Sequence, residues 1–193
     1  MKDLPIVVIG AGIAGLYYAL KVAPKNPVIL ISKNQLNIGN SLLAQGGIAA
    51  AIAEDDSVER HLNDTLVAGA GLCHSEVVKK VVEMGPHLID ELAALGVPFT
   101  QMNHNFSLHK EGGHSTRRIL HVDDMTGAAI HKSLLAQVLC HPDITLLEDH
   151  IAIDLIHKRQ ILKSPITHNR CLGVYVLDIK KSSVKTLPAS QVA

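Results

Sequence analysis

The N-terminal part of the chain alternates short apolar runs with one longer periodic segment. Residues 5–10 (PIVVIG) and residues 28–32 (VILIS) are apolar and rich in β-branched side chains, which is typical of strands buried on both faces of a parallel sheet. The intervening residues 13–23 follow a helical pattern, which Pro24 ends. The pattern therefore predicts a strand–helix–strand unit over residues 5–33 with a right-handed crossover.

The middle of the chain contains two segments that differ in composition and periodicity. Residues 34–53 are rich in Gly, Ala, Asn and Ser without a strong period, which favours a functional, largely irregular segment. Residues 54–140 are predicted to form a helical insert. In it, residues 56–59 (DSVE) look like a capping box, Ser75 is expected to cap a second helix, and Gly85-Pro86 is expected to break that helix in two. The predicted apolar faces comprise Val58, Leu62, Leu66 and Ala70 in the first helix, and Val77, Val78, Val81 and Val82 in the second.

The second half of the chain ends in a group of strands. Residues 104–118 are polar and non-periodic, so we expect a loop there. Asp124 or Thr126 opens a helix whose predicted inner face comprises Ile130, Leu134, Val138 and Leu139. Strands are then predicted within residues 144–179, at 144–147, 151–156 and 171–179. The tail, 180–193, has no strong pattern.

Composition excludes several classes of protein. Lys plus Arg is 18 and Asp plus Glu is 18, so the chain has no basic excess for nucleic acid. No apolar run in the sequence approaches the roughly 20 residues of a membrane span, and the N-terminus does not have the pattern of a signal peptide. Three cysteines without CxxC spacing indicate reduced thiols in a cytoplasmic protein. The 12 histidines lack ligand spacing, so we expect no metal site.

A glycine-rich phosphate loop lies between the first predicted strand and helix. The GxGxxG motif comprises Gly10, Ala11, Gly12, Ile13, Ala14 and Gly15. In such a loop the first glycine makes a tight turn, the second lets the backbone approach a pyrophosphate, and the third lets the helix pack closely on the strand. The second strand ends in Ser32-Lys33 instead of the usual acidic residue, which disfavours a plain NAD dehydrogenase but leaves ribose or phosphate contacts open. A glycine-rich turn without a ligand is the alternative.

Two later segments carry a family resemblance. Residues 40–50 (NSLLAQGGIAA) closely resemble the flavin-binding segment of the superfamily of succinate dehydrogenase, fumarate reductase and L-aspartate oxidase flavoproteins. Residues 111–121 (EGGHSTRRILH), followed by residues 124–127 (DMTG), resemble the L-aspartate oxidase branch in particular. The similarity runs from Ile6 to about Val176. It implies a Rossmann-like FAD-binding domain in the α/β class, with a parallel sheet, helical inserts and a late antiparallel strand group.

The resemblance also implies which residues bind FAD. Besides the phosphate loop, Ser32 and Lys33, they are Asn40, Ser41, Leu42, Leu43, Ala44, Gln45, Gly46 and Gly47. From the residue types alone, an ordinary Ala/Gly-rich loop would be the preferred interpretation. Membrane-bound members of the superfamily carry a histidine at the position of Asn40 as the covalent flavin attachment, so Asn40 implies non-covalent FAD. In the L-aspartate oxidase branch, the residue matching Glu111 orients the amino group of the substrate, whereas the residue types alone would favour a solvated loop charge.

The implied activity is oxidation of L-aspartate to iminoaspartate, in which a hydride passes from the substrate Cα to flavin N5. Oxygen or fumarate would reoxidise the flavin, and the product would enter de novo NAD biosynthesis, with quinolinate synthase as a partner. The family is more than twice as long as this chain. We therefore expect an N-terminal piece, inactive alone, without the capping domain and the C-terminal part of the FAD domain. Two alternatives stay open: a soluble fumarate reductase or succinate dehydrogenase flavoprotein, and a non-catalytic nucleotide-binding fragment.

Overall fold

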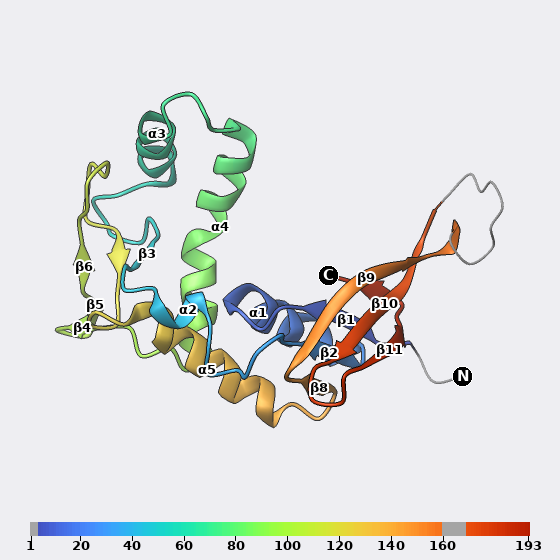
Figure 1. Ribbon diagram of the computed structural model, residues 1–193. Helices are drawn as coiled ribbons and strands as arrows, with labels where there is room; N and C mark the ends of the chain where they lie inside the picture. Colours follow the sequence, from blue (N-terminus) through green and yellow to red (C-terminus); the bar gives the residue numbers. More distant parts are fainter. Residues whose placement is uncertain (1–3, 160–168) are drawn as a thin grey trace. The chain divides into compact units, whose positions relative to one another are not determined.

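The computed structural model describes residues 4–159 and 169–193, and it has the mixed α/β architecture that the pattern predicts (Figure 1). The chain divides into two compact units. The first comprises residues 1–41 and 134–193, and the second comprises residues 42–133. The part of the predicted strand group at residues 160–168 lies outside the described residues.

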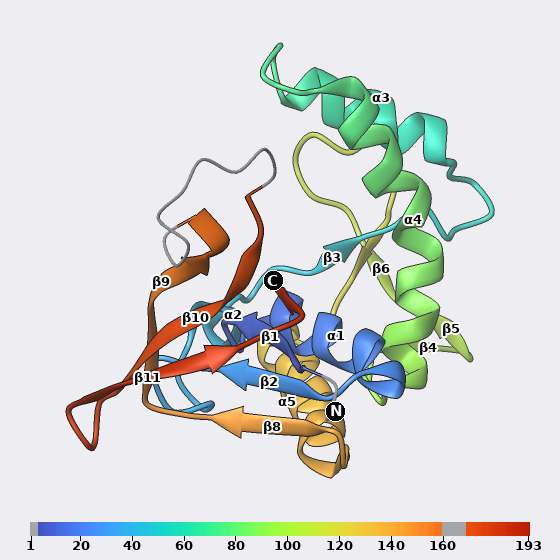
Figure 2. The same cartoon turned by 90° about the vertical axis from the view of Figure 1, so that its right-hand side faces the viewer.

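A parallel four-stranded sheet forms the base of the first unit. Its strands lie in the order β12-β1-β2-β8, and all neighbours are parallel. The parallel strands β2 and β8 can be followed in Figure 2. The elements are β1 (Ile6–Ile9), α1 (Ile13–Val22), the short 3₁₀ turn η1 (Ala23–Lys25), β2 (Val28–Ile31), β8 (Ile144–Leu147) and β12 (Gln191–Val192). The predicted strand–helix–strand unit is therefore confirmed. Its strands are buried because helices and a second sheet supply apolar partners on both faces.

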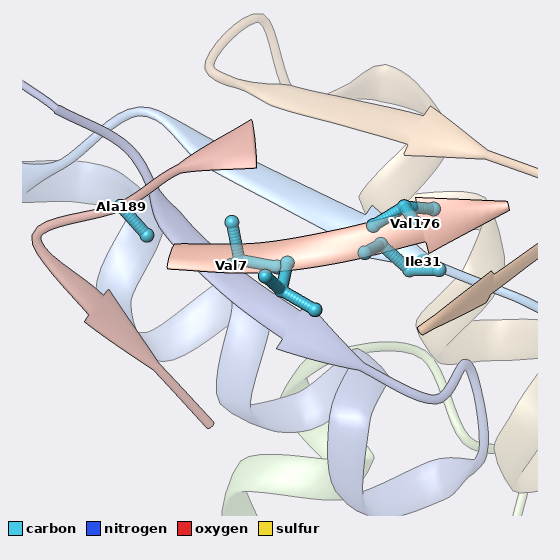
Figure 3. Close-up of a cluster of buried hydrophobic side chains, with 5 residues drawn as sticks. Val7, Ile31, Val176 and Ala189 are labelled. Atoms are coloured by element: carbon cyan, nitrogen blue, oxygen red, sulfur yellow. The ribbon is translucent and has the colours of Figure 1, made fainter. Parts of the chain in front are cut away.

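A second, antiparallel sheet in the first unit covers the parallel one. It comprises β9 (His150–His157), β10 (Cys171–Asp178) and β11 (Ser183–Pro188), in the order β11-β10-β9. Its buried side chains meet those of the parallel sheet in one apolar cluster (Figure 3), formed by Val7, Ile31, Val174, Val176 and Ala189. The late antiparallel strand group is thus confirmed. The sequence pattern missed β11 and β12, because β11 is almost wholly exposed and is held by backbone pairing with β10.

The second unit contains both helices and short strands. The elements that lie in it or cross its ends are α2 (Asn40–Leu43), β3 (Ile48–Ala49), α3 (Val58–Ala68), α4 (Ser75–Ala94), β4 (Gln101–Met102), β5 (Asn105–Phe106), β6 (Leu108–His109), β7 (Ile119–Leu120) and α5 (Thr126–Cys140). The strands form an antiparallel sheet, β3-β7-β6, and the hairpin β4-β5. Residues 104–118 are therefore not a plain loop, since β5 and β6 lie within them. Strands of two residues show too little alternation for a sequence pattern to detect.

Helix α4 continues through Gly85-Pro86, so the predicted break is wrong. A proline inside a helix removes one amide donor and crowds the carbonyl four residues earlier. Here buried side chains lie on both sides of the proline, namely Val82, Ile89 and Leu92. Their packing holds one continuous helix despite the proline. His74, not Ser75, is the N-cap residue of this helix.

Several predicted faces and caps are shifted. Ser57, rather than Asp56, caps α3, because its Oγ accepts a hydrogen bond of 3.2 Å from the amide of Arg60. Burial also differs from the pattern. Three predicted inward residues are more than half exposed: Val77 (59%), Val81 (64%) and Leu139 (63%). A helix that packs on one side only buries a narrower stripe than its apolar residues would allow.

Candidate functional site

The three glycines between β1 and α1 lie in different structural environments. Gly10 follows β1 with φ of +109°, a conformation that L side chains rarely adopt. A Cβ on Gly15 would overlap the carbonyl oxygen of Gly10, so the start of α1 lies directly against the turn. A Cβ on Gly12 would meet only Ser41 Oγ, at 3.4 Å. The fold therefore requires Gly10 and Gly15, whereas Gly12 leaves an open backbone surface.

The N-terminus of α1 is suited to an anion. The N-cap residue, Gly12, has no side chain that could cap this helix, and the first turn contains no acidic residue. Ser41 Oγ lies 3.4 Å from the amide nitrogen of Ile13, and helical bonding starts with the amide of Leu16 donating to the Gly12 carbonyl at 2.9 Å. Helix N-termini carry unpaired amides and a partial positive charge. At the carboxyl end of a parallel strand, this arrangement fits the pyrophosphate of a dinucleotide.

The predicted ribose or phosphate residues follow β2. Ser32 is buried and its hydroxyl donates to the carbonyl of Asn34 at 2.7 Å, so its oxygen can still accept a hydrogen bond. Lys33 is exposed. A carboxylate oxygen of Glu148, the residue after β8, accepts from the amide of Leu36 at 2.9 Å. Ser32 thus shapes the turn, and Lys33 leaves a cation available at the same edge.

The predicted flavin segment contains one glycine that the protein itself requires. A Cβ on Gly47 would overlap Ile119 and the carbonyl oxygen of Leu120, because β3 begins against β7. Nothing lies within 4 Å of a Cβ on Gly46. Close packing therefore explains Gly47, while Gly46 keeps the open backbone that a flat ligand needs.

The rest of the flavin segment is largely exposed. Asn40 and Ser41 belong to the first unit and residues 42–47 to the second. The carbonyl of Ala44 accepts from the amide of Gly127, in the first turn of α5, at 3.0 Å. The side chains of Asn40 and Gln45 are exposed, so their amide groups can bind a ligand.

Glu111 lies on a tight turn between β6 and β7. The amide of His114 donates to the Glu111 carbonyl at 3.2 Å, and Gly113, the third residue of the turn, has φ of +87°. A positive φ at this position favours glycine. The ammonium of Lys110 donates to the carbonyl of Ser115 at 2.9 Å and closes the loop. The Glu111 side chain is exposed.

A buried ion-pair cluster next to this turn was not predicted from the sequence. Arg118 is fully buried, and its Nε and Nη2 donate to the two carboxylate oxygens of Asp56, each at 2.8 Å. Its Nη1 donates to Asp64 Oδ2 at 2.7 Å, and Nη2 also donates to Thr116 Oγ1 at 2.9 Å. No local signal in the sequence indicates this cluster, because its members lie 54 and 62 positions apart.

The cluster keeps its members ionised. Burial raises the pKa of Asp56, but hydrogen bonds from Arg118 and from the Ser57 amide outweigh burial and leave the pKa below its usual value. The backbone amide and then the hydroxyl of Ser115 lower the pKa of Asp64 to about 2. Burial lowers the pKa of Arg118, but its hydrogen bonds to both carboxylates reverse this, and the net change is a raised pKa.

Four histidines near this cluster and the Glu111 turn form two pairs of rings in contact. The rings of His61 and His114 meet edge to face with centroids 5.9 Å apart, and those of His109 and His121 stack at 3.8 Å. Burial, followed by the charge of Arg118, lowers the pKa of His61. Across residues 4–159 and 169–193, no three His, Cys, Asp or Glu side chains are arranged to hold a metal ion. In the same residues, no helix is long and apolar enough to cross a bilayer.

Comparison with known proteins identifies relatives over nearly all of the chain. The family described as "FAD binding domain" matches residues 5–192. "L-aspartate oxidase 1" from Ralstonia nicotianae is 47% identical over 192 residues, which are 98% of this chain and 36% of the relative. "L-aspartate oxidase" from Pseudomonas aeruginosa is 44% identical over 192 residues, covering 95% of this chain and 35% of the relative.

The chain is also similar in fold to solved structures. The E. coli quinol fumarate reductase FrdA with an E245Q mutation matches with a TM-score of 0.89 and 25% identity, over 98% of this chain and 32% of that one. This chain therefore spans about a third of the length of the relatives that it matches.

Proposed function

The chain belongs to the FAD binding domain family, so FAD is its cofactor, and from that premise we propose that it is part of an enzyme that oxidises L-aspartate to iminoaspartate. The observation that carries the proposal is the 44–47% identity to proteins named L-aspartate oxidase over almost the entire chain. The proposal is supported by an α1 N-terminus that starts at Gly12 and has no acidic residue in its first turn, and by an exposed Glu111 on the turn between β6 and β7.

We assign residues 5–33 to nucleotide binding and residues 34–53 to flavin contact. The first turn of α1, entered at Gly12, would bind the pyrophosphate through backbone amides. Lys33 and the oxygen of Ser32 would bind ribose or phosphate, and the side chains of Asn40 and Gln45 would bind flavin ring atoms. When bound, FAD supplies the hydride acceptor for the oxidation.

Glu111 has a separate role in substrate binding. Its carboxylate would accept a charge-assisted hydrogen bond from the ammonium of L-aspartate and so orient the amino acid. Succinate and fumarate have no ammonium. Glu111 therefore favours an amino acid substrate over a plain dicarboxylate.

We also propose that FAD is bound non-covalently, because Asn40 stands where covalent members of the superfamily carry a nucleophilic histidine, and an amide offers no such nucleophile. Acid denaturation of the flavin-loaded enzyme should release all of the flavin into the supernatant. Flavin fluorescence that stays with the protein band on a denaturing gel contradicts this assignment.

The physiological setting is proposed on the same basis. Oxygen or fumarate would be the electron acceptor, the iminoaspartate would pass to quinolinate synthase, and both would serve de novo NAD biosynthesis in the cytoplasm. No nucleic acid or membrane partner is proposed.

The principal test is an assay, with two substrates, of the full-length flavin-loaded enzyme of which this chain is a part. We expect L-aspartate oxidation that yields an imino acid and reduced acceptor, with a kcat/KM at least ten times that for succinate. The reverse preference would support a soluble fumarate reductase or succinate dehydrogenase flavoprotein, which the 25% identity to FrdA keeps as the second candidate. A purified chain with no visible flavin spectrum would instead support a non-catalytic nucleotide-binding fragment.

A further inference from the structure

The carboxylate of Asp64, on α3, accepts three hydrogen bonds through a single oxygen. Its Oδ2 accepts from the amide of Ser115 at 2.7 Å, from the hydroxyl of Ser115 at 2.8 Å and from Arg118 Nη1 at 2.7 Å. The Asp64 side chain is only 12% exposed. One oxygen thus joins helix α3, the buried arginine and the loop that carries Glu111.

Neutralising Arg118 does not require Asp64. Asp56 already pairs with the guanidinium through both carboxylate oxygens, in the bidentate geometry that suits arginine. With Asp64 added, the buried cluster contains two negative charges and one positive charge. Two hydrogen bonds from Ser115 stabilise the second carboxylate. The same two bonds attach the loop that contains Ser115 to helix α3.

The loop needs such an anchor because its turn contains two adjacent glycines. Gly112 and Gly113 follow Glu111, and glycine backbones have more conformational freedom than others. Ser115 lies four residues after Glu111, and its carbonyl also accepts from Lys110. Fixing Ser115 on α3 therefore fixes both ends of the segment from which the Glu111 side chain projects.

We propose that Asp64 is a positioning residue for substrate binding: by holding Ser115 it fixes the turn that presents Glu111 to the ammonium of an amino dicarboxylate. The proposal rests on the proposed function for the role of Glu111. Asp64 touches neither substrate nor cofactor, and it acts only through Ser115.

The first measurement uses this chain and needs no activity. Amide hydrogen exchange of residues 110–116 should be about three- to tenfold faster in Asp64→Asn than in the wild type, because a neutral amide is a weaker acceptor than a carboxylate. Ser115→Ala, which removes only the hydroxyl bond and leaves Arg118 untouched, should show a smaller increase in the same residues. The matched control is Asp90→Asn, at an exposed position on α4, which should leave the loop unchanged. Unchanged exchange in both Asp64→Asn and Ser115→Ala overturns the proposal.

The second measurement uses the full-length flavin-loaded enzyme and separates positioning of the Glu111 turn from general support of the fold. Ser115→Ala should raise KM for L-aspartate about three- to tenfold, with kcat and KM for fumarate within twofold, and Ser115→Thr should restore much of the loss. Equal losses with both substrates would overturn the positioning role. A wild-type enzyme that oxidises no L-aspartate refutes the proposed function, and the substrate role of Asp64 with it, whereas hydrogen exchange still decides whether Asp64 fixes the turn.

Discussion

At the scale of single residues, similar residue types serve different needs in this chain. Gly15 and Gly47 are glycines because neighbouring backbone leaves no room for a Cβ, whereas Gly12 and Gly46 border open space. The fold therefore explains the first two glycines, and we propose that ligand binding explains the other two. Substitutions at these positions can distinguish effects on folding stability from effects on cofactor binding.

A matched pair of alanine substitutions tests this division. Gly12→Ala should change the free energy of unfolding by less than about 0.5 kcal/mol, since its Cβ meets only Ser41 Oγ at 3.4 Å. It should nevertheless weaken FAD binding at least tenfold, because the Cβ occupies the surface that the pyrophosphate approaches. Gly15→Ala should destabilise the fold by about 1–3 kcal/mol through overlap with Gly10. Denaturant unfolding and FAD fluorescence titration measure the two effects, and a Gly12→Ala protein with unchanged FAD affinity would refute the assignment of the loop.

Glu111 is the residue for which substrate choice can be tested. Removing one partner of a charge-assisted hydrogen bond costs about 1.5–3 kcal/mol. Glu111→Gln should therefore reduce kcat/KM for L-aspartate roughly ten- to a hundredfold and leave fumarate reduction nearly intact. Both activities are measured on the same variant. Equal losses would give Glu111 a role in the loop only, and unchanged aspartate oxidation would make it a solvated charge.

The low pKa of Asp64 predicts acid sensitivity with a definite sign. Its folded pKa of about 2 lies below the usual 3.8, so its ionisation stabilises the fold above pH about 4. This contribution is lost as the pH falls from about 4 to about 2. The stability difference between wild type and Asp64→Asn, measured by urea unfolding, should therefore shrink across that interval. A difference that stays constant down to pH 2 would contradict the assigned pKa.

At the scale of secondary-structure elements, packing overrides local preferences in α4. Pro86 lies inside the helix, and the buried residues Val82 and Ile89 continue the same face on either side of it. A break was predicted because proline in a helix interior is unfavourable by about 3 kcal/mol relative to alanine. The core contacts of the helix exceed that cost.

Replacing the proline should therefore stabilise the protein. Pro86→Ala restores an amide donor inside α4, and after allowing for the greater freedom of the unfolded chain we expect a gain of about 1–2 kcal/mol in unfolding free energy. Pro98→Ala, at an exposed site after the helix, is the control and should lose up to about 1 kcal/mol. If Pro86→Ala is destabilising, the ring of Pro86 must contribute packing that outweighs the missing bond.

At the scale of the whole molecule, the chain returns at its C-terminal end to its first strand. Strand β12 pairs with β1, the amide of Ala193 donates to Val7 at 2.9 Å, and the amide of Ile9 donates to Ala193 at 2.8 Å. Ala189, just before β12, belongs to the buried cluster in Figure 3. Residues 189–193 therefore extend the parallel sheet beyond β1 and add Ala189 to the core beneath it.

Removal of residues 189–193 should expose the edge of β1. We expect a loss of at least about 2 kcal/mol in unfolding free energy, from backbone hydrogen bonds and the burial of Ala189, together with self-association through the open edge. Hydrogen exchange in β1 and β2 and size-exclusion chromatography are the measurements. Gln191→Ala keeps the backbone pairing and should behave like the wild type. A truncated chain that is equally stable and monodisperse would mean that β12 contributes no stability.

The sequence by itself determined the features that depend on neighbours along the chain. Periodicity predicted β1, α1, β2, α3 and α5 to within a residue or two at most ends, and the glycine spacing predicted the tight turn between β1 and α1, because turns, caps and helix faces join residues only a few positions apart. The flavin segment and Glu111 came from resemblance alone, since Gly- and Ala-rich residues and one loop carboxylate carry no period.

Only the tertiary structure decided which distant groups meet. An arginine in a polar segment would ordinarily lie at the surface. Arg118 is nevertheless fully buried, because Asp56, 62 positions away, and Asp64, 54 positions away, neutralise it. Strand β12 likewise exists because β1 offers it a partner across the whole length of the chain. A buried ion pair and a parallel strand pair are stable only when both partners are present, so neither leaves a pattern in the residues on one side alone.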